Sequence, residues 1–218
     1  MANKEPKVKV QKLTKKFGDL LVLDNLNFEV EEGEFLCIVG PTGCGKTTFL
    51  NSLTRLYEPT AGDILVNGIP VDPKKQNISY IFQEYSSFPW LTVEQNIRFG
   101  LEIKKTPKAE ADANVEEMLD IVGLTKFRNY YPSQLSISML QRVAIARAFA
   151  TKPELLLMDE PYGQLDIDLR FKLEDELIKL WKKTGTTVLF ITHNIEEAVY
   201  LSQKIMVLTN KPTSVKTV

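Results

Sequence analysis

A glycine-rich stretch in the first quarter of the chain restricts the possible fold more than any other feature. Residues 40–47 read Gly-Pro-Thr-Gly-Cys-Gly-Lys-Thr, which matches the phosphate-loop pattern G-x-x-x-x-G-K-[ST]. The run Phe35–Val39 before it is apolar throughout, as in a strand buried on both faces of a parallel sheet. A helix-competent segment follows, to about Arg55. The sequence therefore predicts an α/β fold built around a strand, this loop and a helix.

The loop has the residues that a phosphate-binding site needs. Its glycines let the backbone wrap closely around an anion and direct successive N–H groups at phosphate oxygens. The helix predicted to start near Lys46 adds its N-terminal dipole. We expect Lys46 to reach the β- and γ-phosphates and Thr47 to offer its hydroxyl to Mg²⁺. A chance glycine turn is the alternative, but it would not require the buried strand before the loop and the helix after it.

An acidic pair follows a second buried strand. The apolar run Leu155–Met158 leads directly into Asp159 and Glu160, and ligands of α/β proteins bind at the carboxyl ends of such strands. Asp159 suits Mg²⁺ binding, directly or through water, and Glu160 suits polarising an attacking water. The pair could instead cap a helix that begins at Pro161. Its combination with the glycine-rich loop favours the functional interpretation.

The chain has one histidine, His193, and it also follows a strand-like run, Val188–Thr192. Asn194 and Glu197 then resemble a capping box that opens the next helix, so His193 need not be the cap. A lone histidine is more often incidental than functional. Here the turn directs it to the same sheet edge as the glycine-rich loop and the acidic pair.

Strand and helix patterns predict one domain over residues 1–218. Strand patterns occupy 1–83, are absent from 84–150, and return in 151–218. We therefore expect a mainly parallel sheet core from the two outer stretches and an inserted helical lobe at 84–150. The predicted strands are Val8–Leu13, Leu20–Leu23, Leu26–Val30, Phe35–Val39, Leu155–Met158, Val188–Ile191 and a last one at Ile205–Leu208; the predicted helices are Ala109–Val122, Leu140–Thr151, Asp168–Lys183 and Ile195–Leu201.

Composition excludes several classes of protein. The chain has 218 residues with 27 Lys and Arg against 28 Asp and Glu, a net charge of −1, which argues against a dedicated nucleic-acid binder. One histidine and two cysteines leave too few ligands for the common zinc sites. Cys37 and Cys44 do not read as a disulfide framework. Since there is neither a signal-peptide pattern nor an apolar run approaching the ~18 residues of a membrane span, we expect a soluble cytosolic protein.

From about Val8 to Leu208 these motifs, in this order, resemble the ATP-binding cassette (ABC) family of transporter ATPases. The resemblance implies a P-loop NTPase fold with a mainly parallel core sheet, an N-terminal antiparallel β subdomain and an inserted helical lobe. It implies ATP and Mg²⁺ as cofactors and ATP hydrolysis as the reaction. The segments Phe88–Val93 and Tyr131–Ser136 look most like those of the nitrate, sulfonate and taurine importer ATPases.

The resemblance also implies a set of site residues. Glu160, His193, Lys46 and Gln83 would be catalytic, with Glu160 orienting water and His193 contacting the γ-phosphate. Thr47, Gln83 and Asp159 would hold Mg²⁺. The nucleotide would be bound by Phe17, which stacks on adenine, by Gly40, Pro41, Thr42, Gly43, Cys44, Gly45, Lys46, Thr47 and Thr48 of Walker A, by Gln83 and Asp159, and, from the opposite subunit, by Ser136, Ile137, Ser138, Met139 and the D-loop residue Asp166.

One motif departs from the family pattern. The signature segment is usually L-S-G-G-Q or L-S-G-G-M, whereas Leu135–Met139 reads Leu-Ser-Ile-Ser-Met. Glycine suits this place because a phosphate must approach the backbone. Ile137 and Ser138 would therefore impair the nucleotide site of the partner subunit, unless a small backbone shift accommodates them. A smaller departure is Gln164 of the D-loop, where alanine is usual.

The resemblance predicts the ATPase subunit of an importer for a small solute. It would work as a nucleotide-sandwich dimer, with itself or a paralogue, on integral-membrane permease subunits, and indirectly with a solute-binding protein. It would lie peripherally at the cytoplasmic face of the membrane, without nucleic acid as a partner. The chain ends soon after the last predicted strand, so we expect no regulatory C-terminal domain.

Several alternatives stay open. The chain could be a weakly hydrolysing or non-hydrolysing subunit of an asymmetric heterodimer, because of Ile137 and Ser138. It could be a non-transport ABC ATPase, although it lacks tandem cassettes and long coiled-coil insertions. A small-molecule P-loop kinase would lack the segment Leu135–Arg147. Phe17 could be ordinary hairpin packing, and Phe88 and Trp90 could be core aromatics of the lobe instead of a docking surface.

Overall fold

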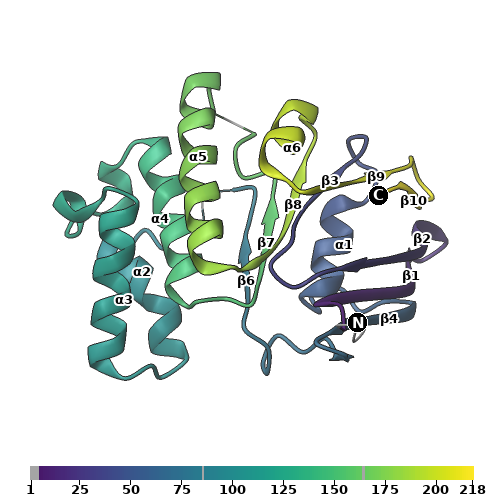
Figure 1. The fold of residues 1–218 in the computed structure, drawn as a ribbon, viewed down its shortest axis with the longest axis horizontal. Coiled ribbons are helices and arrows are strands. Elements are labelled where there is room, and N and C mark those ends of the chain that lie inside the picture. Colours follow the sequence, from purple (N-terminus) through teal and green to yellow (C-terminus); the bar gives the residue numbers. More distant parts are fainter. Residues whose placement is uncertain (1–4, 85, 164) are drawn as a thin grey trace.

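Two β-sheets and a group of helices follow one another along the long axis of the molecule (Figure 1). The computed structural model describes residues 5–84, 86–163 and 165–218. An antiparallel sheet lies at one end, helices lie at the other, and a mainly parallel sheet lies between them. This arrangement confirms the predicted fold class, including the antiparallel subdomain and the inserted helical lobe.

The antiparallel sheet begins with a long hairpin. Phe17 pairs with Leu20 across a tight turn at Gly18, whose φ of 56° is left-handed and favours glycine. The runs predicted at 20–23 and 26–30 belong to one strand. They were predicted as two strands because a bulge at Asn25, with φ 51°, interrupts the apolar alternation. The strand order is β2 (Leu20–Val30), β1 (Val8–Phe17), β4 (Ala61–Val66) and β5 (Ile69–Pro70).

The parallel core sheet carries the three apolar runs that the sequence singled out. Its central strands β3 (Phe35–Val39), β8 (Thr187–Thr192) and β7 (Leu155–Asp159) are buried along their whole length. Neighbouring strands of this sheet run parallel, except that the strands at 204–208 and 215–217 pair antiparallel. The strand order is β10 (Val215–Thr217), β9 (Lys204–Leu208), β3, β8, β7 and β6 (Ile78–Ile81).

Successive residues of β3 face two different hydrophobic clusters. Phe35 and Cys37 pack with the helices α4 (Ile137–Ala150) and α5 (Ile167–Thr184), whereas Leu36 and Ile38 pack with the antiparallel sheet and α1 (Lys46–Leu53). Burial on both faces explains why these strands have continuous apolar sequences instead of alternation. The same burial holds the carboxyl ends of β3, β7 and β8 at one rigid edge.

The helical lobe consists of α2 (Val93–Ile103), α3 (Lys108–Ile121) and α4, between β6 and β7 in the chain. Two 3₁₀ turns, Thr125–Phe127 and Pro132–Gln134, connect α3 to α4. The helix α2 was not predicted, although Thr92 and Gln95 form a capping box at its start. Among the described residues, none of the helices combines the length and apolarity that crossing a membrane requires.

Several predicted elements need correction: the first strand, expected to end at Leu13, runs on to Phe17, and β4, β5 and β6 were not predicted. The helix expected at 140–151 begins three residues earlier, because Ser136 caps it. The strand Ile205–Leu208 is not the last, since β10 pairs antiparallel with β9 after it. The sequence did not indicate β10 because Val215 is half-buried, the other two residues are exposed, and the three form no apolar run. The prediction of α6 (Ile195–Leu201) is confirmed.

Candidate active site

The glycine-rich loop joins β3 to α1 at the edge of the core sheet. Gly45 precedes α1 with a φ of 120°, and a Cβ added to it would lie 2.9 Å from Val22 Cγ1. Only glycine fits this conformation and this close approach. Because Gly45 has no side chain to cap α1, the first N–H groups of the helix stay available to an anion.

The Lys46 side chain is buried inside the loop. Its ammonium group donates to the carbonyl oxygens of Gly40, at 2.9 Å, and Pro41, at 3.2 Å. It also lies 3.6 Å from Glu160 Oε1. The loop and the end of β7 are therefore joined by one buried cation.

Glu160 and His193 meet where β7 and β8 end. Glu160 Oε2 lies 2.9 Å from His193 Nδ1, so the carboxylate bridges His193 and Lys46. Glu160 has a left-handed φ of 46°, and its N–H donates to the carbonyl of Ile191 at 3.0 Å. A non-glycine residue in this conformation is strained, and such strain persists where the surroundings fix it. The strand ends thus hold three predicted catalytic side chains together.

Asp159 is buried beside this group. It accepts a hydrogen bond from the Tyr80 hydroxyl at 3.3 Å, and the Thr47 side chain lies close enough to lower its pKa. Burial raises the pKa of Asp159, and the charge of Glu160 adds to this, while Thr47, Tyr80 and Lys46 oppose it. The carboxylate and the Thr47 hydroxyl are hard oxygen donors of the kind that Mg²⁺ prefers, so this pair fits the expected metal.

A cavity of about 460 Å³ opens beside the loop. Glu160 and Lys46 lie on its wall, as do Gln83 and, from the hairpin of β1 and β2, Phe17. The lining therefore combines apolar, cationic and hydroxyl groups. Among the described residues its lining is Phe17, Leu20, Val22, Thr42, Gly43, Gly45, Lys46, Thr47, Thr48, Gln83, Glu160 and Lys211.

Some predicted site residues lie near this cavity but are not among the described residues that line it. Asp159 lies behind Thr47, and His193 behind Glu160. The Cys44 side chain is buried in a hydrophobic cluster, so only its backbone is available to a ligand. Tyr80, Leu20, Val22 and Lys211 were not singled out from the sequence.

Phe17 satisfies both interpretations of its role. Its ring packs edge-on against Tyr57, with centroids 5.3 Å apart, as in ordinary hairpin packing. The ring is nevertheless 42% exposed and lines the cavity. Lys15 Nζ lies 4.8 Å from its centroid. An exposed ring at the apolar end of a cavity can stack on a planar ligand.

Comparison with known proteins assigns this arrangement to a family. Residues 23–163 match the ABC transporter family. The chain belongs to the ABC transporter family. It is 43% identical to the nitrate import ATP-binding protein of Synechocystis over 201 residues, 92% of this chain and 76% of that protein. It is 42% identical to the aliphatic sulfonates import ATP-binding protein of Bacillus cereus, over 91% of this chain and 78% of that protein.

A solved structure of a similar protein has the same fold and contains a bound nucleotide. It is a dimeric ATP-binding cassette in a post-hydrolysis state, bound to ADP and phosphate. The match has a TM-score of 0.82 at 33% identity and covers 96% of this chain and 97% of that one. The protein is thus an ABC ATPase similar to the nitrate and sulfonate import ATP-binding proteins.

The signature segment of this ABC ATPase lies at the start of α4. Ser136 Oγ caps the helix by accepting from Met139 N at 3.4 Å, and lies 2.9 Å from Ser138 Oγ. Ser138 is therefore in the first turn and is not the cap. Ile137 is 50% exposed. Asp166 caps α5 through Leu169 N, and Gln164 lies outside the described residues.

The cavity wall, as far as the structure describes it, includes neither the signature segment nor Asp166. The structure therefore brings the Walker A, Walker B, Gln83 and His193 positions together, and leaves the residues predicted to act in trans elsewhere on the surface.

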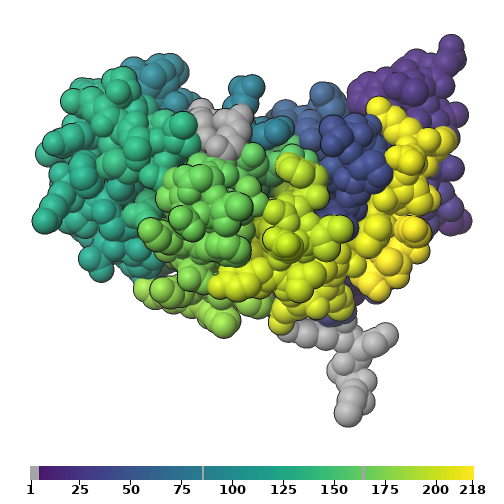
Figure 2. Space-filling view, turned by 90° about the horizontal axis from the view of Figure 1, so that it is seen from above, coloured from purple at the N-terminus to yellow at the C-terminus, as the bar shows by residue number. Residues whose placement is uncertain are grey.

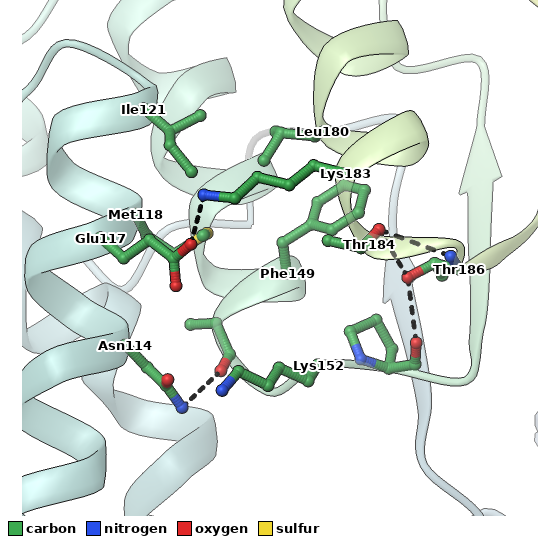
Figure 3. Close-up of a pocket in the computed structure, with 12 residues that line it drawn as sticks. Asn114, Glu117, Met118, Ile121, Phe149, Lys152, Leu180, Lys183, Thr184 and Thr186 are labelled. Atoms are coloured by element: carbon green, nitrogen blue, oxygen red, sulfur yellow. Dashed lines mark hydrogen bonds and ion pairs between the residues drawn. The ribbon is translucent and has the colours of Figure 1, made fainter.

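A second cavity, of about 330 Å³, lies between α3, the end of α4 and α5 (Figure 3). Lys183 spans its mouth and pairs with Glu117, and Asn114 donates to the carbonyl of Ala150. Among the described lining residues there is no predicted site residue. The ion pair between Lys183 and Glu117 ties the lobe to the core.

Proposed function

We propose that this chain is the ATP-hydrolysing subunit of an importer for a small solute of the nitrate, sulfonate or taurine class. The observation that carries the proposal is the Glu160 carboxylate, which lies between Lys46 and His193 at the wall of the cavity. The names of the relatives support the solute class. The site contacts ATP and not the solute, so the class rests on those relatives.

In this proposal the cavity binds ATP along its length. Phe17 stacks on the adenine at the apolar end. The backbone N–H groups of residues 40–48 and the start of α1 surround the phosphates. Lys46 exchanges its bonds to the loop carbonyls for the β- and γ-phosphates. Thr47, Asp159 and Gln83 would hold Mg²⁺, which neutralises phosphate charge when bound.

Glu160 then orients the attacking water and polarises its O–H bond. His193 holds the carboxylate through Nδ1 and contacts the γ-phosphate with the other side of its imidazole ring. Lys46 stabilises the negative charge that develops on the transferred phosphoryl group. The rigid edge formed by β3, β7 and β8 supports this role, because transfer to water depends mainly on positioning.

We propose that the second half of each site comes from another subunit. Ser136, Ile137, Ser138, Met139 and Asp166 would approach ATP held by the partner, which the dimeric relative supports. The exposed Ile137 side chain stands on the first turn of α4, where a phosphate would meet the backbone. We propose that it weakens hydrolysis in the partner's site. The alternative, a non-hydrolysing subunit of a heterodimer, rests on the same residues.

A hollow of about 420 Å³ beside β6 supports membrane permease subunits as partners. Phe82 and Ile103 line it and are exposed, and Phe88 packs there 4.4 Å from Phe99. Trp90 beside it is 70% exposed, so its interpretation as a core aromatic is wrong. We propose that a permease subunit covers this hollow, which places the protein peripherally at the cytoplasmic face of the membrane. A solute-binding protein would act only through the permease.

One contact connects the hollow to the signature helix. The guanidinium group of Arg147, on α4, donates to the carbonyl oxygen of Ser86 at 2.7 Å and to the Ser86 hydroxyl at 2.6 Å. The same group lies 5.2 Å from the Phe88 ring centroid. We propose that residues 84–150 move as an inserted lobe of one 218-residue ATPase domain, and that this contact couples nucleotide binding to the permease.

The substitution Glu160→Gln tests the catalytic proposal. The amide keeps the shape but is a far weaker base, so phosphate release should fall by ~10²-fold or more while ATP binding is retained. Glu196→Gln, an exposed residue of α6, is the matched control and should behave as wild type. Normal turnover in Glu160→Gln would overturn the assignment.

The double substitution Ile137→Gly and Ser138→Gly tests the signature. If Ile137 obstructs the partner's phosphate, steady-state ATPase activity should rise by ~10²-fold, the low end of what one preorganised hydrogen-bond donor contributes. Thermal unfolding checks that two glycines in α4 have not destabilised the helix. Unchanged activity in a folded variant would show that the native signature is tolerated.

A further inference from the structure

The turn between β9 and β10 packs against the glycine-rich loop. Thr213 in this turn is fully buried; its N–H donates to the Val22 carbonyl, and its carbonyl accepts from Asp24 N, both at 2.9 Å. Its hydroxyl donates to the carbonyl oxygen of Cys44. Figure 2 shows the same arrangement at the surface, with the yellow C-terminal segment between the purple N-terminal hairpin and the blue segment that follows β3. The turn is therefore part of the wall around the loop.

The turn is also closed internally. Thr209 N donates to the carbonyl of Ser214 at 3.0 Å, and Ser214 N donates back to Thr209 Oγ1 at 2.9 Å. Thr213 Oγ1 stands 3.6 Å from the position of a Cβ on Gly45. Lys211, two residues before Thr213, is thus carried by a turn anchored at the start of α1.

Lys211 lines the 460 Å³ cavity together with Phe17, Val22 and Thr48. Within the part of the chain that the structure describes, it takes part in no ion pair. Among the described lining residues the one carboxylate is Glu160, which already faces Lys46 and His193. Lys211 therefore presents an uncompensated positive charge to this cavity.

The position along the cavity selects the part of the ligand. Lys46 and Glu160 mark the end where the β- and γ-phosphates lie in the proposed function, and Phe17 marks the adenine end. Lys211 is two residues from Thr213, whose N–H donates to the Val22 carbonyl, and Val22 is adjacent to Gly45 at the start of α1. The group of ATP between adenine and the β-phosphate that carries negative charge is the α-phosphate.

We propose that Lys211 is a further nucleotide-binding residue, whose ammonium group contacts the α-phosphate of the bound nucleotide. The inference rests on the proposed ATP-binding function. ATP and ADP share this phosphate, so Lys211 stabilises both equally and adds uniform binding, which lowers KM without changing kcat. The contact is a charge-assisted hydrogen bond at a partly exposed site, so it weakens with added salt.

The experiment measures the binding of MgATP and MgADP to the full chain by calorimetry, at two salt concentrations. The variants are Lys211→Gln, Lys211→Arg and, as a matched control, Lys216→Gln on β10 of the same hairpin, which does not line the cavity as described. We expect about fivefold weaker binding of both nucleotides by Lys211→Gln, corresponding to ~1 kcal/mol, recovery in Lys211→Arg, and wild-type binding in Lys216→Gln. Thermal unfolding without nucleotide should be unchanged in all three.

Each way in which the proposal can fail gives a different result. Wild-type affinity in Lys211→Gln, alongside nucleotide binding that Lys46→Ala abolishes, would overturn the Lys211 assignment and leave the proposed function intact. An equal loss in Lys216→Gln would overturn it too, since general charge would then explain the effect. A loss for ATP alone would place Lys211 at the γ-phosphate and contradict the α-phosphate contact. If the wild type itself bound neither nucleotide, the proposed function would fail with it.

Discussion

Glu174 on α5 offers a test of how this core tolerates a buried acid. Its side chain is fully buried, and neither carboxyl oxygen accepts a hydrogen bond from a donor in the described part of the chain. The carboxyl of Glu197, on α6, lies close enough to raise the pKa of Glu174. Burial raises the pKa of Glu174 from its ordinary 4.5 to about 7, the charge of Glu197 adds to the rise, and Arg170 opposes it.

The direction of the pH dependence follows from this raised pKa. The folded state binds this proton more tightly than the unfolded state, so the contribution of Glu174 to the free energy of unfolding is most favourable below pH 4.5. It falls as the pH rises through about 7 and is constant above that. At 1.36 kcal/mol per pKa unit the loss would be at most ~3.4 kcal/mol, and screening together with the coupled titration of Glu197 reduces this to ~1–2 kcal/mol.

The substitution Glu174→Gln removes the titration and keeps the shape. Its amide is neutral at every pH and can donate to the Glu197 carboxylate. In urea unfolding followed by circular dichroism, we expect the variant to exceed wild type by ~1–2 kcal/mol at pH 8, and the difference to shrink markedly at pH 5. Glu102→Gln, an exposed acid on α2, should show no such pH dependence. A difference of the same size at both pH values would refute the reasoning.

Two other predictions concern the site and the lobe. Tyr80→Phe removes the hydroxyl that donates to Asp159; with that support lost, MgATP affinity should fall about threefold while affinity for nucleotide without metal stays unchanged, measured by titration with and without a chelator. Asn96 is fully buried and bonds to Phe88 N and to the carbonyls of Phe88, Leu91 and Thr92. Asn96→Ala should therefore cost ~2–4 kcal/mol in urea unfolding, and a loss below 1 kcal/mol would show that water replaces these bonds.

Local sequence patterns predicted most of the site because its parts are local. A phosphate loop after a buried strand and an acidic pair after another need no knowledge of distant contacts, and parallel pairing brings the strand ends together. Tyr80 and Lys211 reach the site only through neighbours on other elements: β6 lies beside β7, and the last turn packs on β2. These contacts exist only in the folded molecule, so no spacing in the sequence indicates them.

Two of the elements that the sequence missed, α2 and β10, share another cause. The helix α2 has a capping box at Thr92 and Gln95, but its residues carry mixed polarity, and Asn96 is a polar residue in its buried face. The strand β10 is held by pairing with β9 and not by burial of its own side chains. Tertiary contacts decide such elements, whereas their own residues do so for β3, β7 and β8.

The contact of Arg147 with Ser86 has a mechanical consequence for the signature helix. Arg147 lies ten residues after Ile137 on one uninterrupted helix, which corresponds to ~15 Å along its axis. A helix of this length behaves as a stiff rod, so a tilt imposed at its first turn displaces Ser86 and the aromatic rings beside it. In the proposed dimer, a displacement caused by a subunit contact at Ile137 would therefore be transmitted along α4 to Arg147. Flexible loops would not be needed to transmit it.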